Sequence, residues 1–160
     1  MRLVIAAVGR LKDGPERDLL DRYVKRVGQA GRALGLNSID LFEIPEGRSS
    51  TAQLRQVDEA ARLLKQVSNA EVLVALDEGG RAMTSRTFAE LIAKQRDRGA
   101  HSLAFLIGGP DGHGDAITAK ADFTLSLGPM TLPHGLARIV LAEQLYRATT
   151  ILAGHPYHRD

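Results

Sequence analysis

Short apolar runs rich in β-branched residues alternate along this chain with stretches whose apolar residues recur every three or four positions. Leu3 to Val8 is a continuous apolar run, typical of a strand that is covered on both faces. The segment that begins at Pro15 then places Leu19, Tyr23 and Val27 on one side of a helix. This alternation favours an α/β fold with a mostly parallel sheet, because each helix returns the chain to the same end of the sheet.

Four further strands are expected downstream, separated by helices and polar loops. The second helix is marked by Leu54, Val57, Ala61 and Leu64, which recur at helical spacing and form its apolar side. Asp77 to Arg81 is predicted to be a turn beyond the carboxyl end of the third strand. The four further strands are expected at Ile39 to Ile44, Val72 to Leu76, Leu103 to Ile107 and Phe123 to Leu127.

The composition is that of a globular chain and excludes several kinds of site. Hydrophobic residues make up 44% of the 160 residues and charged residues 25%, so residues 1–160 are expected to form one domain. The absence of cysteine excludes disulfides, thiolate metal sites and cysteine nucleophiles. Lys and Arg total 21 against 19 Asp and Glu, so attraction to a polyanion must come from local clustering. No membrane span or signal peptide is expected, which predicts a cytoplasmic protein.

The predicted last helix, from Gly135 to Leu152, carries two apolar stripes instead of one. Two stripes require burial on two sides, and one of them can face the sheet. A symmetric partner chain is the simplest cover for the other, which predicts a homodimer, and neighbouring helices of the same chain are the alternative. The stripes are Leu136, Ile139, Val140 and Tyr146 on one side and Leu141, Leu145, Ala148 and Leu152 on the other.

Three loops follow the predicted strand ends at Leu76, Ile107 and Leu127, where open α/β sheets bind ligands. The segment Gly108 to Gly112 holds three glycines within five residues, so its backbone can approach a ligand closely. It matches neither the phosphate loop nor the dinucleotide fingerprint, and a glycine-rich turn without a ligand is the alternative. The segment Met130 to His134 is apolar, which suits a pocket for adenine or packing against the last helix.

The C-terminal tail and the last helix carry the side chains best suited to chemistry. His155 and His158 are three residues apart, but no acidic or thiol ligands cluster with them, so a metal site is not favoured. Histidine, tyrosine and arginine together suit hydrogen bonding, stacking and contact with an anion, and a solvated terminus is the alternative. Arg138 and Arg147 can form salt bridges along the helix or offer a fork to a phosphate or a base carbonyl.

Four segments, in this order, give the chain a recognisable signature. It resembles the ribosomal RNA large subunit methyltransferase H family of the SPOUT superfamily over its whole length, with the terminal His-Pro-Tyr-His as the most specific element. The segments are Leu103 to Gly112, Thr131 to His134, Ala142 to Ala148 and His155 to Arg159.

The resemblance implies a Rossmann-like α/β fold with a C-terminal trefoil knot, a homodimer and S-adenosylmethionine as methyl donor, without a metal. It implies methylation at N3 of a pseudouridine in 23S rRNA, with the assembled ribosome as substrate. One alternative is a SPOUT methyltransferase that acts on transfer RNA or on another rRNA site. Others are a non-enzymatic RNA-binding module and a metal hydrolase that uses the histidines.

The family pattern also indicates where the donor and the reacting base would lie. With this substrate, His155 is the candidate proton acceptor, Tyr157 stacks on or hydrogen-bonds the base, and Arg138 and Arg147 stabilise the anion or hold a phosphate. In a dimer, the tail of one chain could complete the site of the other. Pro129 has no N–H, which removes one possible backbone contact to the donor. The donor site is expected at Leu76, Gly108, Gly109, Leu127, Gly128, Pro129, Met130, Thr131 and Leu132.

Overall fold

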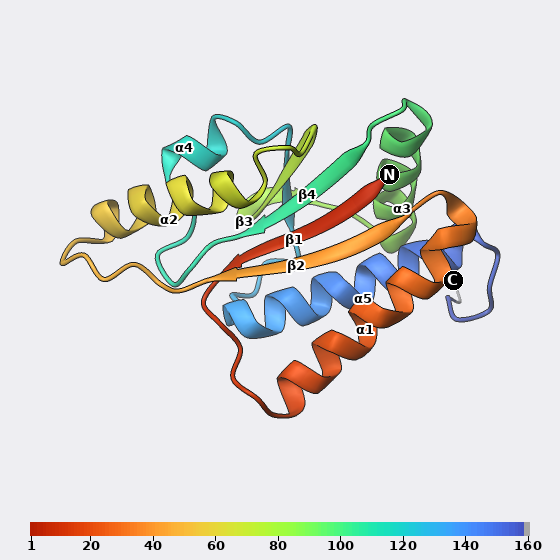
Figure 1. The fold of residues 1–160 in the computed structure, drawn as a ribbon, viewed down its shortest axis with the longest axis horizontal. Helices are drawn as coiled ribbons and strands as arrows, with labels where there is room; N and C mark the ends of the chain where they lie inside the picture. Colours follow the sequence, from red (N-terminus) through yellow and green to blue (C-terminus); the bar gives the residue numbers. More distant parts are fainter. Residues whose placement is uncertain (159–160) are drawn as a thin grey trace.

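The alternating segments form one five-stranded sheet in the computed structural model, which describes residues 1–158. The strands are β1 (Arg2–Val8), β2 (Ser38–Ile44), β3 (Val72–Ala82), β4 (Ser102–Ile107) and β5 (Phe123–Ser126). The helices are α1 (Pro15–Gly31), the 3₁₀ turn η1 (Arg32–Leu34), α2 (Ala52–Gln66), α3 (Ser85–Asp97), α4 (Asp115–Thr118) and α5 (His134–Leu152). The strand order is β2-β1-β4-β3-β5 and every pair is parallel, which confirms the predicted fold class (Figure 1).

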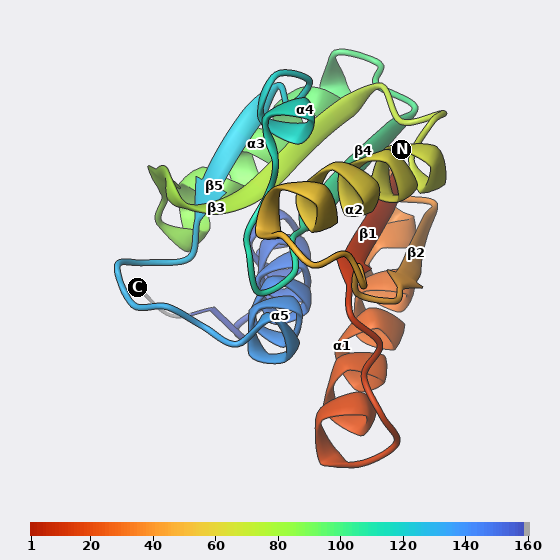
Figure 2. The same cartoon turned by 90° about the vertical axis from the view of Figure 1, so that its left-hand side faces the viewer.

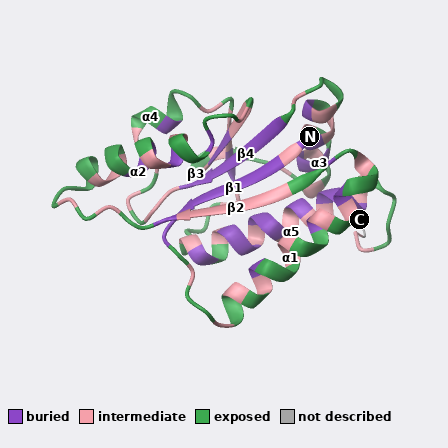
Figure 3. Cartoon of the chain, viewed as in Figure 1, coloured by how far each residue is buried: buried purple, intermediate pink, exposed green. Residues whose placement is uncertain are grey.

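Helices cover both faces of this sheet, so its central strands are buried on both sides (Figures 2 and 3). On β1, Leu3 and Ile5 face the layer formed by α1, α3 and α5. Val4 and Ala6 face the opposite layer, formed by α2 and α4. The continuous apolar run of β1 therefore has the burial that its sequence predicts. None of the helices formed by residues 1–158 is long and apolar enough to cross a bilayer.

The predicted turn at Asp77 to Arg81 is wrong, because β3 continues to Ala82. Leu76 and Arg81 both pair with Leu125 of β5, so the residues between them are extruded as a bulge. A Cβ on Gly80 would lie 2.8 Å from the backbone of Leu125, so only glycine allows this close passage. The turn-forming residues thus interrupt the strand without ending it.

Helix α2 forms where it was predicted, but it turns a different side toward the sheet. Leu54 and Val57 are 56% and 60% exposed, whereas Glu59, Ala60 and Leu63 are buried. The first turns of α2 extend beyond the carboxyl ends of the strands (Figure 1), so the sheet offers no apolar surface beneath them. The position of the helix, more than its strongest apolar stripe, decides which residues are buried.

Helix α5 lies on the sheet between α1 and α3 (Figures 1 and 2). Leu141 and Leu145 are fully buried, and the Tyr146 ring packs against that of Tyr23 from α1 at 6.2 Å between centroids. Helices of the same chain therefore supply much of the second cover that the two stripes require. Leu136 remains 42% exposed. The trefoil knot and the homodimer stay predictions.

Candidate active site

The bulge of β3 and the loops that follow β4 and β5 enclose a cleft of about 710 Å³ at the carboxyl edge of the sheet. Ligand sites in open α/β sheets occupy this position, and a cleft of this size accommodates a nucleoside-sized ligand. Every residue predicted to hold the donor, except Pro129, lines it. Residues expected at three separate strand ends are thus brought together in one place.

The glycine-rich loop after β4 folds tightly back on itself at the wall of the cleft. A Cβ on Gly108 would lie 2.9 Å from the backbone of Gly112, and Gly112 has a φ of +75° that favours glycine. The Gly112 N–H donates to the Gly109 carbonyl at 2.9 Å. The turn requires glycine at positions 108 and 112, so a ligand would meet backbone at these positions.

The segment between β5 and α5 forms the apolar side of the cleft. The Ser126 hydroxyl accepts from the Gly128 N–H at 3.2 Å and donates to the Gly128 carbonyl at 3.1 Å, which fixes the start of the loop. Leu127 and Leu132 line the cleft, and Met130 is 79% exposed at its edge. Apolar side chains opposite a backbone wall suit a flat, weakly polar ring.

Five titratable residues outside the predicted donor set also line the cleft: Asp77, Glu78, Asp111, His113 and His134. Asp77 and Glu78 follow the end of the predicted third strand, and that place in the chain was the signal available in the sequence. The Nε2 atom of His113 lies 3.1 Å from the carbonyl oxygen of Leu106. Burial lowers the pKa of His113, so its ring is neutral near pH 7. Among residues 1–158, no three histidines or carboxylates cluster as a metal site would require.

Arg138 does not reach the cleft, because its side chain is fully buried behind it. Its guanidinium donates to the carbonyls of Val8 at 2.8 Å and Gly9 at 3.0 Å and forms an ion pair with Glu43. Glu43 also pairs with Arg17. Burial raises the pKa of Glu43, but the Arg17 hydrogen bond and the Arg138 charge outweigh it, so the pKa lies below its ordinary value. The geometry gives Arg138 a structural role, but its partner is Glu43 of β2 and not a residue along the helix as the sequence suggested.

Arg147, His155 and Tyr157 lie together on the surface at the C-terminal end of α5. Arg147 pairs with Glu143 at 2.5 Å, and its Cζ lies 4.9 Å from the centroid of the Tyr157 ring. The Tyr157 hydroxyl donates to Glu143 at 3.1 Å, and the Tyr157 N–H donates to Nδ1 of His155 at 3.2 Å. Three of the four predicted catalytic residues therefore form one cluster, which we call the tail cluster. Arg159 of the tail motif lies outside the described residues.

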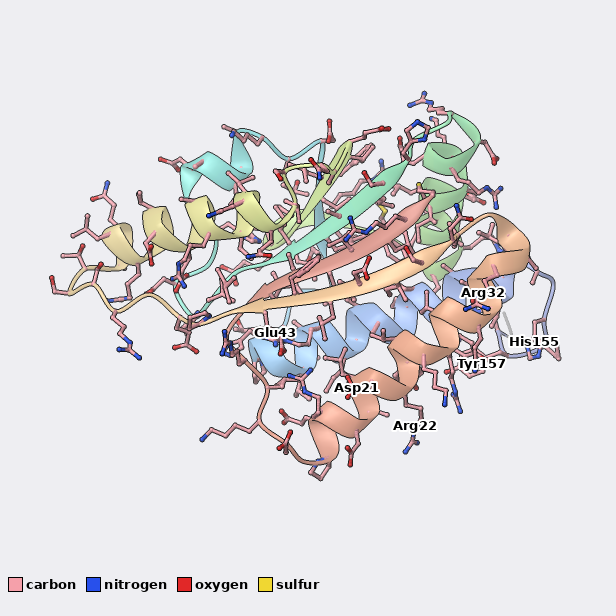
Figure 4. The ribbon with its side chains drawn as sticks, in the orientation of Figure 1. Asp21, Arg22, Arg32, Glu43, His155 and Tyr157 are labelled. Carbon is pink, nitrogen blue, oxygen red and sulfur yellow. The ribbon has the colours of Figure 1, made fainter. Side chains whose placement is uncertain are left out.

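The cleft and the tail cluster occupy opposite ends of α5. The helix has 19 residues, and at 1.5 Å per residue it spans about 28 Å. Figure 4 shows Glu43 near the beginning of α5, whereas His155 and Tyr157 lie near its other end. Within one copy of the chain, a ligand in the cleft therefore does not meet the tail cluster.

Comparison with known proteins agrees with this geometry. The family described as "Predicted SPOUT methyltransferase" matches residues 1–158. A protein of Brucella anthropi named ribosomal RNA large subunit methyltransferase H is 52% identical over 160 residues, covering all of both chains. A protein of the same name from Brucella ovis is 49% identical over the full length of both.

Solved structures with low sequence identity share the fold. A probable methylase family protein from Haemophilus influenzae has a TM-score of 0.52 at 12% identity, covering 99% of this chain and 70% of that one. A probable methyltransferase from Bordetella pertussis has a TM-score of 0.50 at 17% identity, covering 92% and 95%. With the fold, the cleft at its strand ends and the match over 1–158, the chain belongs to the SPOUT methyltransferase family.

Proposed function

We propose that this protein transfers a methyl group from S-adenosylmethionine to N3 of a pseudouridine in 23S rRNA of the assembled ribosome. The observation that carries the proposal is the glycine-walled cleft at the strand ends in a chain whose full-length relatives are named ribosomal RNA large subunit methyltransferase H. The cleft supplies a site for the donor, and the relatives supply the class of substrate.

The residues of the cleft fit the chemistry of the donor. Leu127 and Leu132 offer an apolar surface for adenine, and the loop from Gly108 to Gly112 offers backbone to the polar groups. The carboxylates of Asp77 and Glu78 lie where a sulfonium or ammonium group would be stabilised. S-adenosylmethionine, when bound, supplies a methyl group that its sulfonium already activates, so the transfer needs no metal.

The separation of the cleft from the tail cluster supports a site shared between two copies of the chain. The tail of one protomer would reach the cleft of its partner, so the homodimer would be required for catalysis. A second hollow of about 230 Å³ lies beside the cleft, and Leu127 and Gly128 line both. Its wall includes Val140 of α5 and Met83, which are partly exposed apolar residues on which a second copy can pack.

The tail cluster then supplies the groups that handle the proton of the base. N3 of pseudouridine must lose its proton as its bond to the methyl group forms, and His155 accepts that proton at Nδ1. In the free tail this nitrogen accepts the Tyr157 N–H in an exposed hydrogen bond, so that hydrogen bond must open before Nδ1 can accept the proton. A positioned base contributes about 10²–10⁴-fold to such a step.

The other two residues of the tail cluster stabilise the base and its charge. Burial and contacts with Tyr23 and Glu143 raise the pKa of Tyr157, so its hydroxyl stays protonated and serves as a donor beside a stacked base. Arg147 places a cation where it can stabilise the negative charge that develops on the base.

The charge of the chain supports a particle as the substrate in preference to free RNA. A net charge of +2 gives little attraction to an arbitrary polyanion, so recognition would depend on the shape of the assembled ribosome. An enzyme that acts on assembled ribosomes works in the cytoplasm, which is where we place this protein.

The direct test is methylation with a labelled donor of assembled ribosomes, isolated large subunits, free 23S rRNA and transfer RNA, followed by mass spectrometric mapping. We expect label at one pseudouridine, only in the assembled particle. Label on transfer RNA or on another rRNA nucleotide would support the alternative SPOUT activity. Calorimetry with S-adenosylhomocysteine separates an enzyme from a non-enzymatic RNA-binding module, because only the enzyme should bind it.

A further inference from the structure

Glu59 of α2 is a buried carboxylate that the proposed chemistry does not use. Its residue is 3% exposed, and its Oε1 accepts from the Gly47 N–H at 2.6 Å. Its Oε2 is also buried and has no hydrogen-bond partner in the described chain. A buried carboxylate oxygen without a donor costs free energy, because it has left water and gained nothing in exchange.

The unpartnered oxygen lies directly behind the glycine loop of the cleft. A Cβ built on Gly109 would lie 3.0 Å from Oε2 of Glu59 and 3.0 Å from a methyl carbon of Val8. Gly109 itself lines the cleft. Gly109 therefore lies between this oxygen and the space that we assign to the donor.

The same face of α2 holds the far end of this loop through two other side chains. Arg55 forms a two-pronged ion pair with Asp111, at 2.7 Å from Nε and 3.0 Å from Nη2. Gln56 donates to the Asp111 carbonyl at 2.6 Å. Since residues 55, 56 and 59 lie within about one turn of the helix, α2 holds the loop at one end and leaves an open acceptor at the other.

We propose that Glu59 is a positioning residue of the donor site, whose Oε2 accepts a backbone N–H of the Gly108–Gly112 loop when the cleft is filled. Filling the cleft presses the loop toward α2, and the new hydrogen bond removes the cost of the unpartnered oxygen. Glu59 thus favours the bound arrangement of the loop without touching the donor. This inference rests on the proposed function, since it requires the cleft to bind the donor.

The test compares Glu59→Gln with Asp58→Asn, using S-adenosylhomocysteine as the ligand in calorimetry and thermal melting of the full chain. Glutamine keeps the shape and the acceptor for Gly47, but it places an NH₂ group where Oε2 stood. We expect the affinity of Glu59→Gln for S-adenosylhomocysteine to fall about tenfold, the loss that corresponds to one charge-assisted hydrogen bond. Asp58, whose side chain is 51% exposed, lies on the same turn, and Asp58→Asn should bind as the unmodified protein does.

Thermal melting separates positioning from a simple structural role. We expect Glu59→Gln without ligand to melt no lower than the unmodified protein and to gain less stability from the ligand. In turnover, the KM for the donor should rise while kcat stays the same. A variant that melts lower yet binds S-adenosylhomocysteine with unchanged affinity would overturn the inference.

If Glu59→Gln fails to fold, the complex of the unmodified protein with S-adenosylhomocysteine tests the inference instead. In a crystal structure with S-adenosylhomocysteine, Oε2 should lie within about 3.2 Å of a backbone nitrogen of the loop, and an Oε2 still without a donor would overturn the inference. Failure of the unmodified protein to bind the ligand would instead overturn the proposed function itself. The two failures are therefore distinguishable.

Discussion

Two arginines of α5, nine residues apart, face entirely different surroundings. The Arg138 side chain is fully buried, where its guanidinium donates to three backbone carbonyls and to Glu43. The Arg147 side chain is 26% exposed, and it lies between Glu143 and the ring of Tyr157. The same residue type on one helix therefore stabilises the fold at one end and offers a charge to the surface at the other.

The same contrast extends to the two ends of the molecule. The cleft is walled largely by glycine backbone and apolar side chains, which can bind a donor, and His113 and His134 also line it. The tail cluster has a histidine, a tyrosine and an arginine but lies toward the other end of α5, a helix of 19 residues that spans about 28 Å. The cleft has room for the donor and the tail cluster has the arginine and tyrosine suited to the base, which is the physical reason for proposing that two copies share a site.

Replacing Arg138 should have the largest effect, and the effect should be on folding. Arg138→Met leaves Glu43 without one of its two cationic partners and leaves two carbonyls without a donor, so we expect a loss of roughly 3–5 kcal/mol of unfolding free energy. Arg147→Met is the matched control, and its loss should stay below about 1 kcal/mol because the pair with Glu143 is partly exposed. Urea denaturation measures both.

The opposite result would return Arg138 to the role expected from the sequence. If Arg138→Met were as stable as Arg147→Met, bound S-adenosylhomocysteine normally and lost methyl transfer, the guanidinium would have to contact the substrate. The contrast between the two ends of α5 would then fail.

The sequence predicts the strands and the cleft better than it predicts the roles of single side chains. Leu3 to Val8 is buried on both sides, as its unbroken apolar run indicates, and the glycines after Ile107 reach the cleft because parallel strands end at the same edge. The burial of Arg138 depends on Glu43, which is 95 positions away, so no local pattern reveals it. Leu54 and Val57 are exposed because α2 extends past the sheet, a matter of tertiary placement that helical periodicity does not contain.

Removing the imidazole of His155 should have the next largest effect, and it should spare both folding and donor binding. We expect His155→Ala to lower the rate of methyl transfer about 100-fold on saturating ribosomes, because the step loses its proton acceptor. Calorimetry with S-adenosylhomocysteine should give an unchanged affinity, since His155 acts on the proton of the base and is not among the residues that line the cleft. A rate equal to that of the unmodified protein would remove His155 from the chemistry.

Mixing two inactive variants tests whether the two ends come from different copies. Gly108→Val should abolish donor binding, because its Cβ would meet the Gly112 backbone at 2.9 Å, while its tail stays intact. Co-expressed with His155→Ala, it should restore about a quarter of the normal activity, since half of the dimers are mixed and each mixed dimer has one complete site. Gly28→Ala is a suitable control, because its Cβ meets nothing closer than 3.8 Å. No recovery would place both ends in one copy.

The effect of Arg147→Met on catalysis should be smaller than that of His155→Ala. Arg147 stabilises charge next to the base without accepting a proton, so we expect about a tenfold lower kcat, the value of one charge interaction. Arg147→Lys keeps the charge but loses the planar stacking on Tyr157, and it should recover only part of the rate. Single-turnover rates on assembled ribosomes measure both variants, and equal rates for Met and Lys would show that the charge is irrelevant.

The smallest expected effect is on the pH dependence of stability. It distinguishes His113 of the cleft from His155 of the tail cluster. Burial lowers the pKa of His113 below its ordinary 6.5, despite the opposing influence of Asp77 and of two backbone carbonyls. As the pH falls below about 6.5, the unfolded chain takes up a proton before the folded chain does, so stability decreases until the folded pKa is passed. The slope contributed by one such group is at most about 1.4 kcal/mol per pH unit.

His113→Asn should remove this contribution in urea denaturation between pH 7.5 and 5.5, which is about one pH unit on either side of the ordinary pKa of 6.5. His155→Ala should keep it, and parallel curves for His113→Asn and the unmodified protein would show that the cleft does not hold this histidine neutral.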